Sequence, residues 1–462
     1  MLSDVSAVIV AAGQGTRMKS RMAKVLHRAG GKALVEHVVA AAKGIAPPER
    51  IFVVVGHQAD AVAAVARAAG VNSIHQTEQL GTGHAVMCGE ERLAGLGGLL
   101  FVLNGDCPLI RSETLRELIA LYRETGAGAA MITTDLDDPT GYGRIIRQAN
   151  GDVEAIVEHK AATPEQRAVR EINVGFYCFD AAAFWKHVHE IRPDNPAREY
   201  YLTDMIAILL KAGYRVTALK AADSTEMLGI NNRIELAAVD RIMRERKVRR
   251  LMLDGVTIEK PETVTIDADV TIGPDTVVGP FTQITGQTAI GENCRIGASS
   301  IIDNSLLGDD VEVFPFSSIS ASRLDARAQV GPYARLRMGA HLAEGAHVGN
   351  FVELKKTNLG AGSKSMHLAY LGDSEIGAKV NIGAGTITCN YDGRDKHQTT
   401  IGDGAFVGSN STLVAPVGIG SGAYIGAGSV ITDAVPDKAL ALGRARQVVK
   451  EGWVRKPTPK KS

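Results

Sequence analysis

The 462-residue sequence has few aromatic residues, few cysteines and no excess of charge of either sign. Lys and Arg number 51 and Asp and Glu number 51, for a formal net charge of +0, which excludes the overall basic excess typical of nucleic-acid binders. No apolar run approaches the ~20 residues of a membrane helix, and the opening MLSDVSAVIVAAG lacks the basic start of a signal peptide. We therefore expect a soluble, cytoplasmic protein that binds neither nucleic acid nor membranes.

The cysteines are too scattered to form a zinc knuckle or a disulfide framework, because no C-x-x-C pair is present. We expect all five thiols to be reduced and buried, at Cys88, Cys107, Cys178, Cys294 and Cys389. By contrast, glycine is abundant, with 50 residues, while aromatic residues make up only 5% of the chain. This composition predicts many tight turns around a core of small aliphatic side chains.

The first half of the chain alternates short apolar runs with helical stretches. Buried strands are expected at Ala7 to Val10, Ile51 to Val55 and Leu99 to Leu103, with helices between them at residues 60–69, 84–93 and 112–122. This alternation predicts an α/β, Rossmann-like nucleotide-binding domain, in which ligands bind at the carboxyl ends of parallel strands. The part from residue 142 to 179 has a pattern more typical of antiparallel strands.

An amphipathic helix is expected to connect the two halves. Ile234, Ala238 and Ile242 share one face, and basic residues surround the other, at Arg241, Arg244, Arg246, Lys247, Arg249 and Arg250. We interpret the basic cluster as a solvated face. The expected organisation is the α/β domain at residues 1–231, a helical linker at 232–253, a repeat domain at 254–437 and a C-terminal tail at 438–462.

After Leu253 an aliphatic residue recurs at every sixth position, in three separate runs. The runs are Ile266, Ile272, Val278, Ile284, Ile290, Ile296 and Ile302; then Leu324, Val330, Leu336, Leu342, Val348 and Leu354; then Ile401, Val407, Leu413, Ile419, Ile425 and Ile431. A period of six fits a solenoid of one short strand and one turn per repeat. The pattern resembles the hexapeptide-repeat left-handed parallel β-helix, which implies about ten triangular coils and a prism on the order of 50 Å long.

A glycine loop directly follows the first strand, at Ala11-Ala12-Gly13-Gln14-Gly15-Thr16-Arg17-Met18. Both standard phosphate-binding motifs fail, because each requires glycine where Met18 stands. Gly13 and Gly15 would still let backbone N–H groups approach a phosphate, with cations from Arg17 and Lys24. Asp106, after the Leu99 to Leu103 run, is placed to hold Mg²⁺ against a triphosphate, although an isolated aspartate is more often a cap or turn residue.

The period of six fails at two places in the repeat region, and these defects indicate a second site. Ser365 occupies an aliphatic position and lies beside His367 and Tyr370. Thr388 occupies another. The next aliphatic residue of the pattern, Ile401, comes 13 positions later instead of six, so seven residues are inserted. Insertions in solenoids form loops on one face, so His367 becomes a general-base candidate rather than an ordinary surface histidine.

Taken together, these motifs resemble the family of bifunctional N-acetylglucosamine-1-phosphate uridylyltransferases and glucosamine-1-phosphate acetyltransferases. The similarity covers the glycine loop with Lys24-Val25-Leu26, Gln76 to Ala85, Gly141 to Ile145, Ile156 to Lys160 and Asn231-Asn232-Arg233. Gln14 departs from the pattern, since lysine is frequent at that position. For the first site the resemblance implies Mg²⁺ ligands at Asp106 and Asn231, catalytic cations at Arg17 and Lys24, and substrate contacts at Ala11, Ala12, Gly13, Gly15, Gln76, Gln79, Gly81, Thr82, Gly141, Glu158, Asn173 and Asn231. Asn231 has an alternative interpretation as the cap of the linker helix.

For the second site the resemblance implies acetyl transfer from acetyl-CoA to glucosamine 1-phosphate, with His367 as the base and Glu353 orienting its imidazole. Asn390 and the Tyr391 backbone would position the amine and stabilise the oxyanion. The acceptor would be held by Arg337, Lys355, Tyr370 and Asn381, and acetyl-CoA by Ala384, Asn390, Tyr391, Ser409, Ala427 and Arg444. The family also implies a homotrimer, in which Trp453 and the basic tail from Lys456 to Lys461 would cover a neighbour's site, although disorder is the simpler interpretation of the last residues.

The two activities in sequence would convert glucosamine 1-phosphate, acetyl-CoA and UTP into UDP-N-acetylglucosamine, a precursor of peptidoglycan and lipopolysaccharide. One alternative is a nucleotidyltransferase whose β-helix only assembles or regulates it. A second is a non-enzymatic nucleotide-sugar sensor or scaffold. The frame defects at His367 and Asn390 argue against the first, and Lys24, Asp106 and Asn231 argue against the second.

Overall fold

The computed structural model describes residues 3–454 and divides the chain into two compact units. The first unit ends at Met243 and the second begins at Arg244, so the division falls inside helix α9 (Arg233–Leu253). The basic tail expected from Lys456 to Lys461 lies outside the described residues. Each unit has its own buried core.

The first unit is built on a mixed sheet with the strand order β11-β7-β10-β6-β1-β4-β5. Strands β1, β4, β5 and β6 run parallel, as the alternation of strands and helices predicts, while β10 is antiparallel to both of its neighbours, β6 and β7. A hairpin of β8 (Arg144–Arg147) and β9 (Val153–Val157) joins the edge of β10, which confirms the antiparallel pattern expected there. The main strands are β1 (Val5–Val10), β4 (Ile51–Val55), β5 (Asn72–His75), β6 (Leu99–Asn104), β7 (Ala129–Asp135), β10 (Glu171–Asp180) and β11 (Val216–Lys220).

Helices cover both faces of this sheet, because alternate residues of the buried strands point to opposite sides. Along β1, Ile9 belongs to one apolar cluster and Val8 to another. The first cluster includes α1 (Leu34–Lys43), α2 (Ala59–Ala68) and α5 (Ser112–Thr125). The second includes α3 (Thr82–Met87), α4 (Glu90–Leu93), α7 (Ala181–His187) and α8 (Asp204–Lys211). The helix expected at 84–93 is therefore two helices, with Gly89 between them.

Helix α9 occupies almost the whole range expected for the linker, but its buried face is different from the expected one. Ile234 is 82% exposed, whereas Val239, Val248 and Leu251 are buried. Val239 packs in the first unit, and Val248 and Leu251 pack in the core of the second. The expected apolar face was wrong for Ile234, whereas Ile242 is partly buried and packs against the same cluster as Val239.

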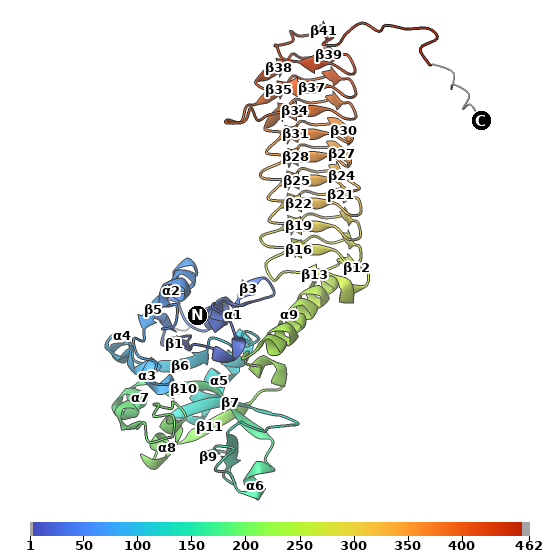
Figure 1. Cartoon of the computed structure of the whole chain (residues 1–462). Coiled ribbons are helices and arrows are strands. Elements are labelled where there is room, and N and C mark those ends of the chain that lie inside the picture. The colour runs from blue at the N-terminus through green and yellow to red at the C-terminus, as the bar shows by residue number, and fades with distance from the viewer. Residues whose placement is uncertain (1–2, 455–462) are drawn as a thin grey trace, which may run out of the picture. The chain divides into compact units, whose positions relative to one another are not determined.

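The second unit is a β-helix whose three faces are parallel sheets (Figure 1). One face has 11 strands, from β12 (Thr257–Ile258) to β41 (Leu440–Ala441), the next 10, from β13 (Thr265–Ile266) to β40 (Val430–Ile431), and the third 9, from β14 (Thr271–Ile272) to β38 (Val417–Ile419). From β12 to β40 each pairing joins a strand to the third strand further along the chain, so three strands make one coil; the last pairing, of β39 with β41, skips only one strand. This agrees with the left-handed hexapeptide β-helix and with about ten coils. Strand β41 adds pairing inside the segment assigned to the tail.

The inward positions of successive coils stack on one another. Leu336, Leu354 and Leu371 are paired in register in β25 (Arg335–Arg337), β28 (Glu353–Lys355) and β31 (Tyr370–Gly372), and all are fully buried. One interruption of this regularity lies between β34 (Ile387–Cys389) and β35 (Thr399–Ile401), where residues 390–398 form the expected inserted loop.

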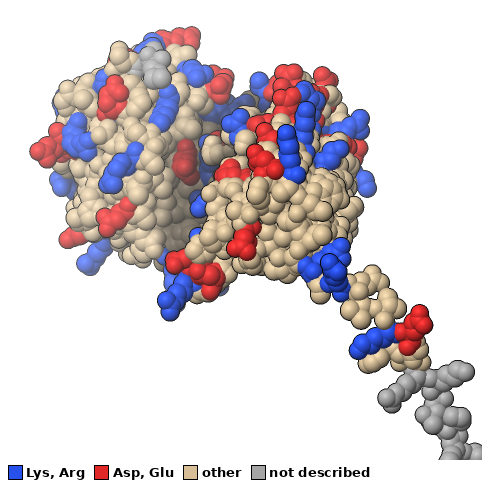
Figure 2. Space-filling model, turned by 90° about the horizontal axis from the view of Figure 1, so that it is seen from above, with Lys and Arg blue, Asp and Glu red and all other residues tan. Residues whose placement is uncertain are grey.

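The remaining expectations from composition have mixed outcomes. All five cysteines are free, but only Cys107, Cys178 and Cys294 are buried, while Cys88 and Cys389 are partly exposed. Among the described residues, no helix is long and apolar enough to cross a membrane. On the face drawn in Figure 2, acidic and basic side chains are interspersed, in keeping with the balanced charge.

Candidate functional sites

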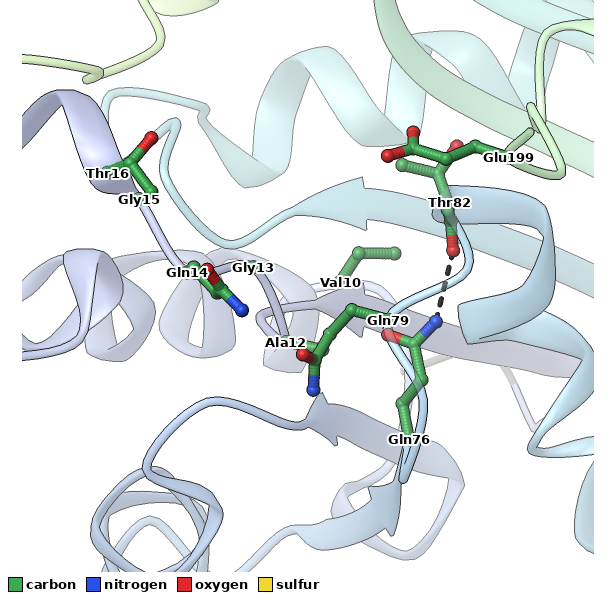
Figure 3. Close-up of a pocket in the computed structure, with 11 residues that line it drawn as sticks. Val10, Ala12, Gly13, Gln14, Gly15, Thr16, Gln76, Gln79, Thr82 and Glu199 are labelled. Carbon is green, nitrogen blue, oxygen red and sulfur yellow. Dashed lines mark hydrogen bonds between the residues drawn. The ribbon is translucent and has the colours of Figure 1, made fainter. Parts of the chain in front are cut away.

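The glycine loop lines a cavity of about 490 Å³ at the carboxyl end of β1 (Figure 3). The loop lies on one side of the cavity, Thr82 and Glu199 lie on the other, and Gln76 and Gln79 lie between them. Gln76 is buried and donates from Nε2 to the Gly81 carbonyl at 3.1 Å. Predicted residues that line the cavity are Ala12, Gly13, Gly15, Gln76, Gln79, Gly81 and Thr82, whereas Ala11 is buried directly behind them.

Sequence reasoning missed several polar residues of this cavity. Gln14, Thr16 and Glu199 line it. Gln14 and Thr16 belong to the glycine loop itself, so their position in that motif could have identified them as cavity residues. Glu199 lies more than a hundred residues away in an irregular segment between η5 (Val188–Glu190) and α8, and no periodicity marks it.

A cluster of opposite charges and one amide lies beside the glycine loop. Gly15 has φ +62°, and a Cβ there would lie 2.6 Å from the Cβ of Lys24, so only glycine allows this approach. The Lys24 ammonium pairs with the Asp106 carboxylate and lies 3.4 Å from Asn231 Oδ1. Arg17 donates to the same Asn231 oxygen at 2.8 Å. The fold thus brings together four predicted residues that lie far apart in the sequence.

The neighbouring residue Asn232, rather than Asn231, caps helix α9. Asn232 Oδ1 accepts from the backbone N–H groups of Ile234 at 2.9 Å and Glu235 at 3.0 Å. The alternative interpretation of Asn231 as the cap was therefore wrong. Its side-chain oxygen is directed to Arg17 and Lys24 instead.

The three residues expected to contact the sugar surround Gly143. Asn173 donates its backbone N–H to the Gly143 carbonyl at 2.9 Å. A Cβ at Gly143 would lie 3.3 Å from Glu158 Oε1, so this glycine allows the carboxylate to approach the strand. Gly141, two residues earlier, has φ +88° and is exposed. The Asn173 side chain is held by Tyr177, whose hydroxyl lies 2.8 Å from Nδ2.

In the second unit, the expected acceptor residues project from neighbouring strands of one face. Arg337 and Lys355 are register partners, as are Glu353 and Tyr370. Arg337 Nε donates to Glu353 Oε1 at 2.7 Å. Asn381, from β33 (Asn381–Ile382), is on a different face and pairs with Phe406. Arg337, Glu353, Lys355 and Tyr370 therefore form one outward-facing polar platform.

His367 lies at the corner next to this platform, after the buried frame defect Ser365. Its Nδ1 lies 2.6 Å from Asn350 Oδ1, and Asn350 is its register partner in the preceding coil. The expected bond from Glu353 to His367 is not formed, because the Glu353 carboxylate is turned toward Arg337. An amide oxygen only accepts, so this arrangement places the imidazole proton on Nδ1 and leaves Nε2 as the basic nitrogen.

The inserted loop brings Asn390 to the opposite corner of the platform. Asn390 is buried, and its Nδ2 donates to Asp373 Oδ2, which also accepts from Lys355 Nζ at 2.8 Å. The bond to Asp373 raises the pKa of Lys355. Burial alone would raise the pKa of Asp373, but the bonds from Lys355 and Asn390 hold it below its usual value. Tyr391 is exposed at the start of the loop.

Three of the residues expected to line the acetyl-CoA groove, Ala384, Ser409 and Ala427, share one corner of the prism with His367, whereas Asn390 and Tyr391 belong to the inserted loop. Ala384 accepts at its carbonyl from Asn410 N–H at 2.7 Å, and Ser409 accepts from Gly428 N–H at 2.8 Å. Ala384, Ser409 and Ala427 are thus equivalent corner positions in successive coils. Arg444 is exposed near the following turn, where its Cδ would be 3.9 Å from a Cβ at Gly428.

Comparisons with known proteins support two kinds of domain. The MobA-like NTP transferase domain family matches residues 7–177, and the bacterial transferase hexapeptide family, of six repeats, matches residues 269–304 and 398–433. Bifunctional protein GlmU from Solibacter usitatus is 59% identical over 456 residues, or 99% of this chain and 98% of the relative. Proteins of the same name from Koribacter versatilis and Shouchella clausii are 51% and 46% identical, covering 97% and 98% of this chain and 96% and 100% of the relatives.

The capping assignment can be tested by thermal denaturation. Replacing Asn232 by alanine should destabilise the first turn of α9 by about 1 kcal/mol, because two backbone N–H groups lose their acceptor. Asn231→Ala is the matched control and should lower the melting temperature less. The assignment is wrong if Asn231→Ala causes the larger loss.

Proposed function

The chain belongs to the family of bifunctional GlmU proteins, and we propose accordingly that it makes UDP-N-acetylglucosamine at two sites, one in each unit. The second unit acetylates glucosamine 1-phosphate with acetyl-CoA. The first unit then transfers a uridylyl group from UTP to N-acetylglucosamine 1-phosphate and releases pyrophosphate. The observation that carries the proposal is that each unit assembles its own constellation of charged and polar side chains.

In the first unit, the cavity beside the glycine loop is the site for UTP. Gln76, Gln79, Gly81 and Thr82 would contact the uracil and ribose, with the backbone N–H groups of the glycine loop directed to the phosphates. Gly141, Glu158 and Asn173 would bind the sugar of the second substrate. Ala12 completes the lining of the cavity, and Ala11 is buried behind it.

Asp106 and Asn231 would hold Mg²⁺. Carboxylate and amide oxygens suit this ion, and both oxygens already face a cation, the Lys24 ammonium. The described residues contain no group of three His, Cys, Asp or Glu side chains that could hold a metal by themselves, so substrate phosphates and water would supply the other ligands. When bound, the ion neutralises phosphate charge.

Uridylyl transfer needs alignment and charge neutralisation more than a protein nucleophile. An oxygen of the sugar 1-phosphate attacks the α-phosphorus of UTP, the new P–O bond forms, and the bond to pyrophosphate breaks. Arg17 and Lys24 stabilise the negative charge that spreads over the phosphates during this step. Asn231 holds Arg17 in position through its side-chain oxygen.

In the second unit, His367 acts as the general base from Nε2. It takes a proton from the amine of glucosamine 1-phosphate as the nitrogen attacks the thioester carbonyl, and it returns a proton to the sulfur of the departing coenzyme A. Arg337, Lys355, Tyr370 and Asn381 would hold the acceptor, the first two through its phosphate.

The inserted loop would stabilise the oxyanion. Hydrogen bonds from His397 N–H to the Asn390 carbonyl and from Asp392 N–H to the Asp395 carbonyl flank the bridge of Tyr391 with Lys396. Tyr391 is therefore in a non-hydrogen-bonded pair, and its N–H points away from the hairpin. Such a free donor is suited to the tetrahedral intermediate.

The acetyl-CoA groove would follow the corner of Ala384, Ser409 and Ala427, with Arg444 near the coenzyme's phosphates. The same corner carries an exposed ladder of aromatic rings: Phe316 stacks on Tyr333 at 5.0 Å, and Tyr333 stacks on Phe351 at 5.4 Å. These three residues have φ between +56° and +62°, a left-handed conformation that is more strained for an aromatic residue than for glycine. Each is also at least half exposed. A row of exposed aromatic rings in a strained backbone conformation indicates a surface that is covered in the assembled protein. We propose that neighbouring copies of the chain cover this surface in a homotrimer.

The proposed function is tested by two assays on the same purified chain. His367→Ala should lower thiol release from acetyl-CoA and glucosamine 1-phosphate by about 100-fold or more, with pyrophosphate release from UTP and N-acetylglucosamine 1-phosphate retained. Asp106→Ala should have the opposite effect, because it removes an expected Mg²⁺ ligand. If the wild-type chain releases pyrophosphate but no thiol, the second unit is not an acetyltransferase and serves only in assembly.

The orientation of His367 generates a separate prediction. Asn350→Ala should lower kcat for acetyl transfer about three- to tenfold, because it removes the acceptor of Nδ1. Glu353→Gln should mainly raise KM for glucosamine 1-phosphate, because Glu353 holds Arg337. The opposite pattern, with kcat reduced only in Glu353→Gln, would return the orienting role to Glu353.

The assembly can be tested by measuring mass in solution. Phe351→Glu places a charge in the aromatic ladder and should shift the chain from trimer to monomer, with loss of acetyl transfer but not of uridylyl transfer. Leu306→Glu is the matched control, because Leu306 is similarly exposed on another face. A wild-type chain that is already monomeric would refute the trimer.

A further inference from the structure

Asp373 is bonded to two residues of the acetyltransferase site at once, although neither composition nor the repeat pattern marks it. Its Oδ2 accepts from Lys355 Nζ at 2.8 Å and from Asn390 Nδ2. Lys355 comes from the preceding coil and Asn390 from the inserted loop. The carboxylate therefore joins a regular coil of the prism to the inserted loop through two hydrogen bonds.

The bond to Asp373 determines which end of the Asn390 amide is available. Because Nδ2 donates to the carboxylate, Oδ1 is the end left for a ligand. A carbonyl oxygen accepts hydrogen bonds, and the amine of the acceptor sugar donates them. Reversing the amide would place an N–H group against that amine and leave the carbonyl oxygen against the carboxylate, which is unfavourable on both sides.

The backbone around Asp373 makes this arrangement specific to its position. Asp373 has a positive φ of +48°, and the equivalent corner residues Met338 and Lys356 also have positive φ, at +57° and +48°. It is the last such corner before the chain departs into the inserted loop. The preceding residue is Gly372, where a Cβ would lie 2.6 Å from the Tyr370 hydroxyl and 2.8 Å from Asn390 Nδ2. The missing side chain lets Tyr370 and Asn390 converge beside Asp373.

Lys355 depends on the same carboxylate. Its side chain is only 6% exposed, and a buried ammonium requires a counter-ion. Lys356 and Lys396 add further positive charge nearby, and the proximity of Lys355 lowers the pKa of Lys396. A single carboxylate thus fixes the direction of the buried lysine among like charges.

We propose that Asp373 is a positioning residue of the acetyltransferase site, which presents the Asn390 carbonyl oxygen to the acceptor amine and directs Lys355 toward the acceptor phosphate. The proposal rests on the function proposed above. It assigns Asp373 no contact with either substrate, so its influence is transmitted through Asn390 and Lys355. The acceptor, rather than acetyl-CoA, is the substrate whose binding depends on it.

The test measures steady-state acetyl transfer with each substrate varied separately. Asp373→Ala should raise KM for glucosamine 1-phosphate about tenfold or more and lower kcat, while KM for acetyl-CoA changes less than about twofold. Asp373→Asn keeps an oxygen acceptor but loses the counter-charge of Lys355, so it should raise this KM less than Asp373→Ala does and still leave it above the wild-type value. Asp325→Ala is the matched control: Asp325 also accepts two bonds, from Arg323 and His341, at another coil of the prism, and its loss should leave both KM values unchanged.

Three results would overturn the proposal: an unchanged KM for glucosamine 1-phosphate in Asp373→Ala, an equal rise in both KM values, or an asparagine variant no better than the alanine variant. If Asp373→Ala does not fold, as judged by its mass in solution, Asp373→Asn decides alone. A selective rise in KM for the acceptor then supports the proposal, and wild-type values overturn it. Thiol release by the wild type and Asp325→Ala separates this outcome from failure of the proposed function.

Discussion

The pairing of each β-helix coil with the next determines which side chains can meet in the second unit. Because Leu336, Leu354 and Leu371 are stacked inward, the flanking residues of the same strands are stacked outward. Arg337 is thereby placed over Lys355, and Glu353 over Tyr370. The polar platform is a consequence of core packing, since a shift of one residue would turn these charged side chains into the apolar core and turn the leucines outward.

Chemistry is concentrated where this regular stacking is interrupted. Thr388 replaces an aliphatic residue in the inward column and accepts from the Gly372 N–H at 2.8 Å, so the polar group is satisfied inside the core. The chain then leaves the prism for residues 390–398 and returns at β35. Regular coils supply rigid neighbours, and the insertion supplies Asn390 and Tyr391, which no hexapeptide could direct over the platform.

The sequence predicted those features that depend on period and local chain conformation. Strands β4 and β6, the ten or so coils, the inserted loop and the glycine loop all follow from the spacing of apolar residues and glycine. Orientation was predicted poorly. Whether Asn231 or Asn232 caps α9, and whether Asn350 or Glu353 faces His367, depends on side-chain direction after folding. Glu199 was missed because only tertiary structure brings it to the cavity.

The two sites contain the same three residue types joined in opposite ways. In the first unit a cation is central: Lys24 faces the oxygens of both Asp106 and Asn231, so the amide directs its carbonyl inward. In the second unit an anion is central: Asp373 accepts from both Lys355 and Asn390, so the amide directs its N–H group inward and its carbonyl outward. The first arrangement holds two oxygens around a position suited to positive charge, as phosphate chemistry with a divalent ion requires. The second leaves a hydrogen-bond acceptor for an amine, so the charge at the centre decides which chemistry each cluster supports.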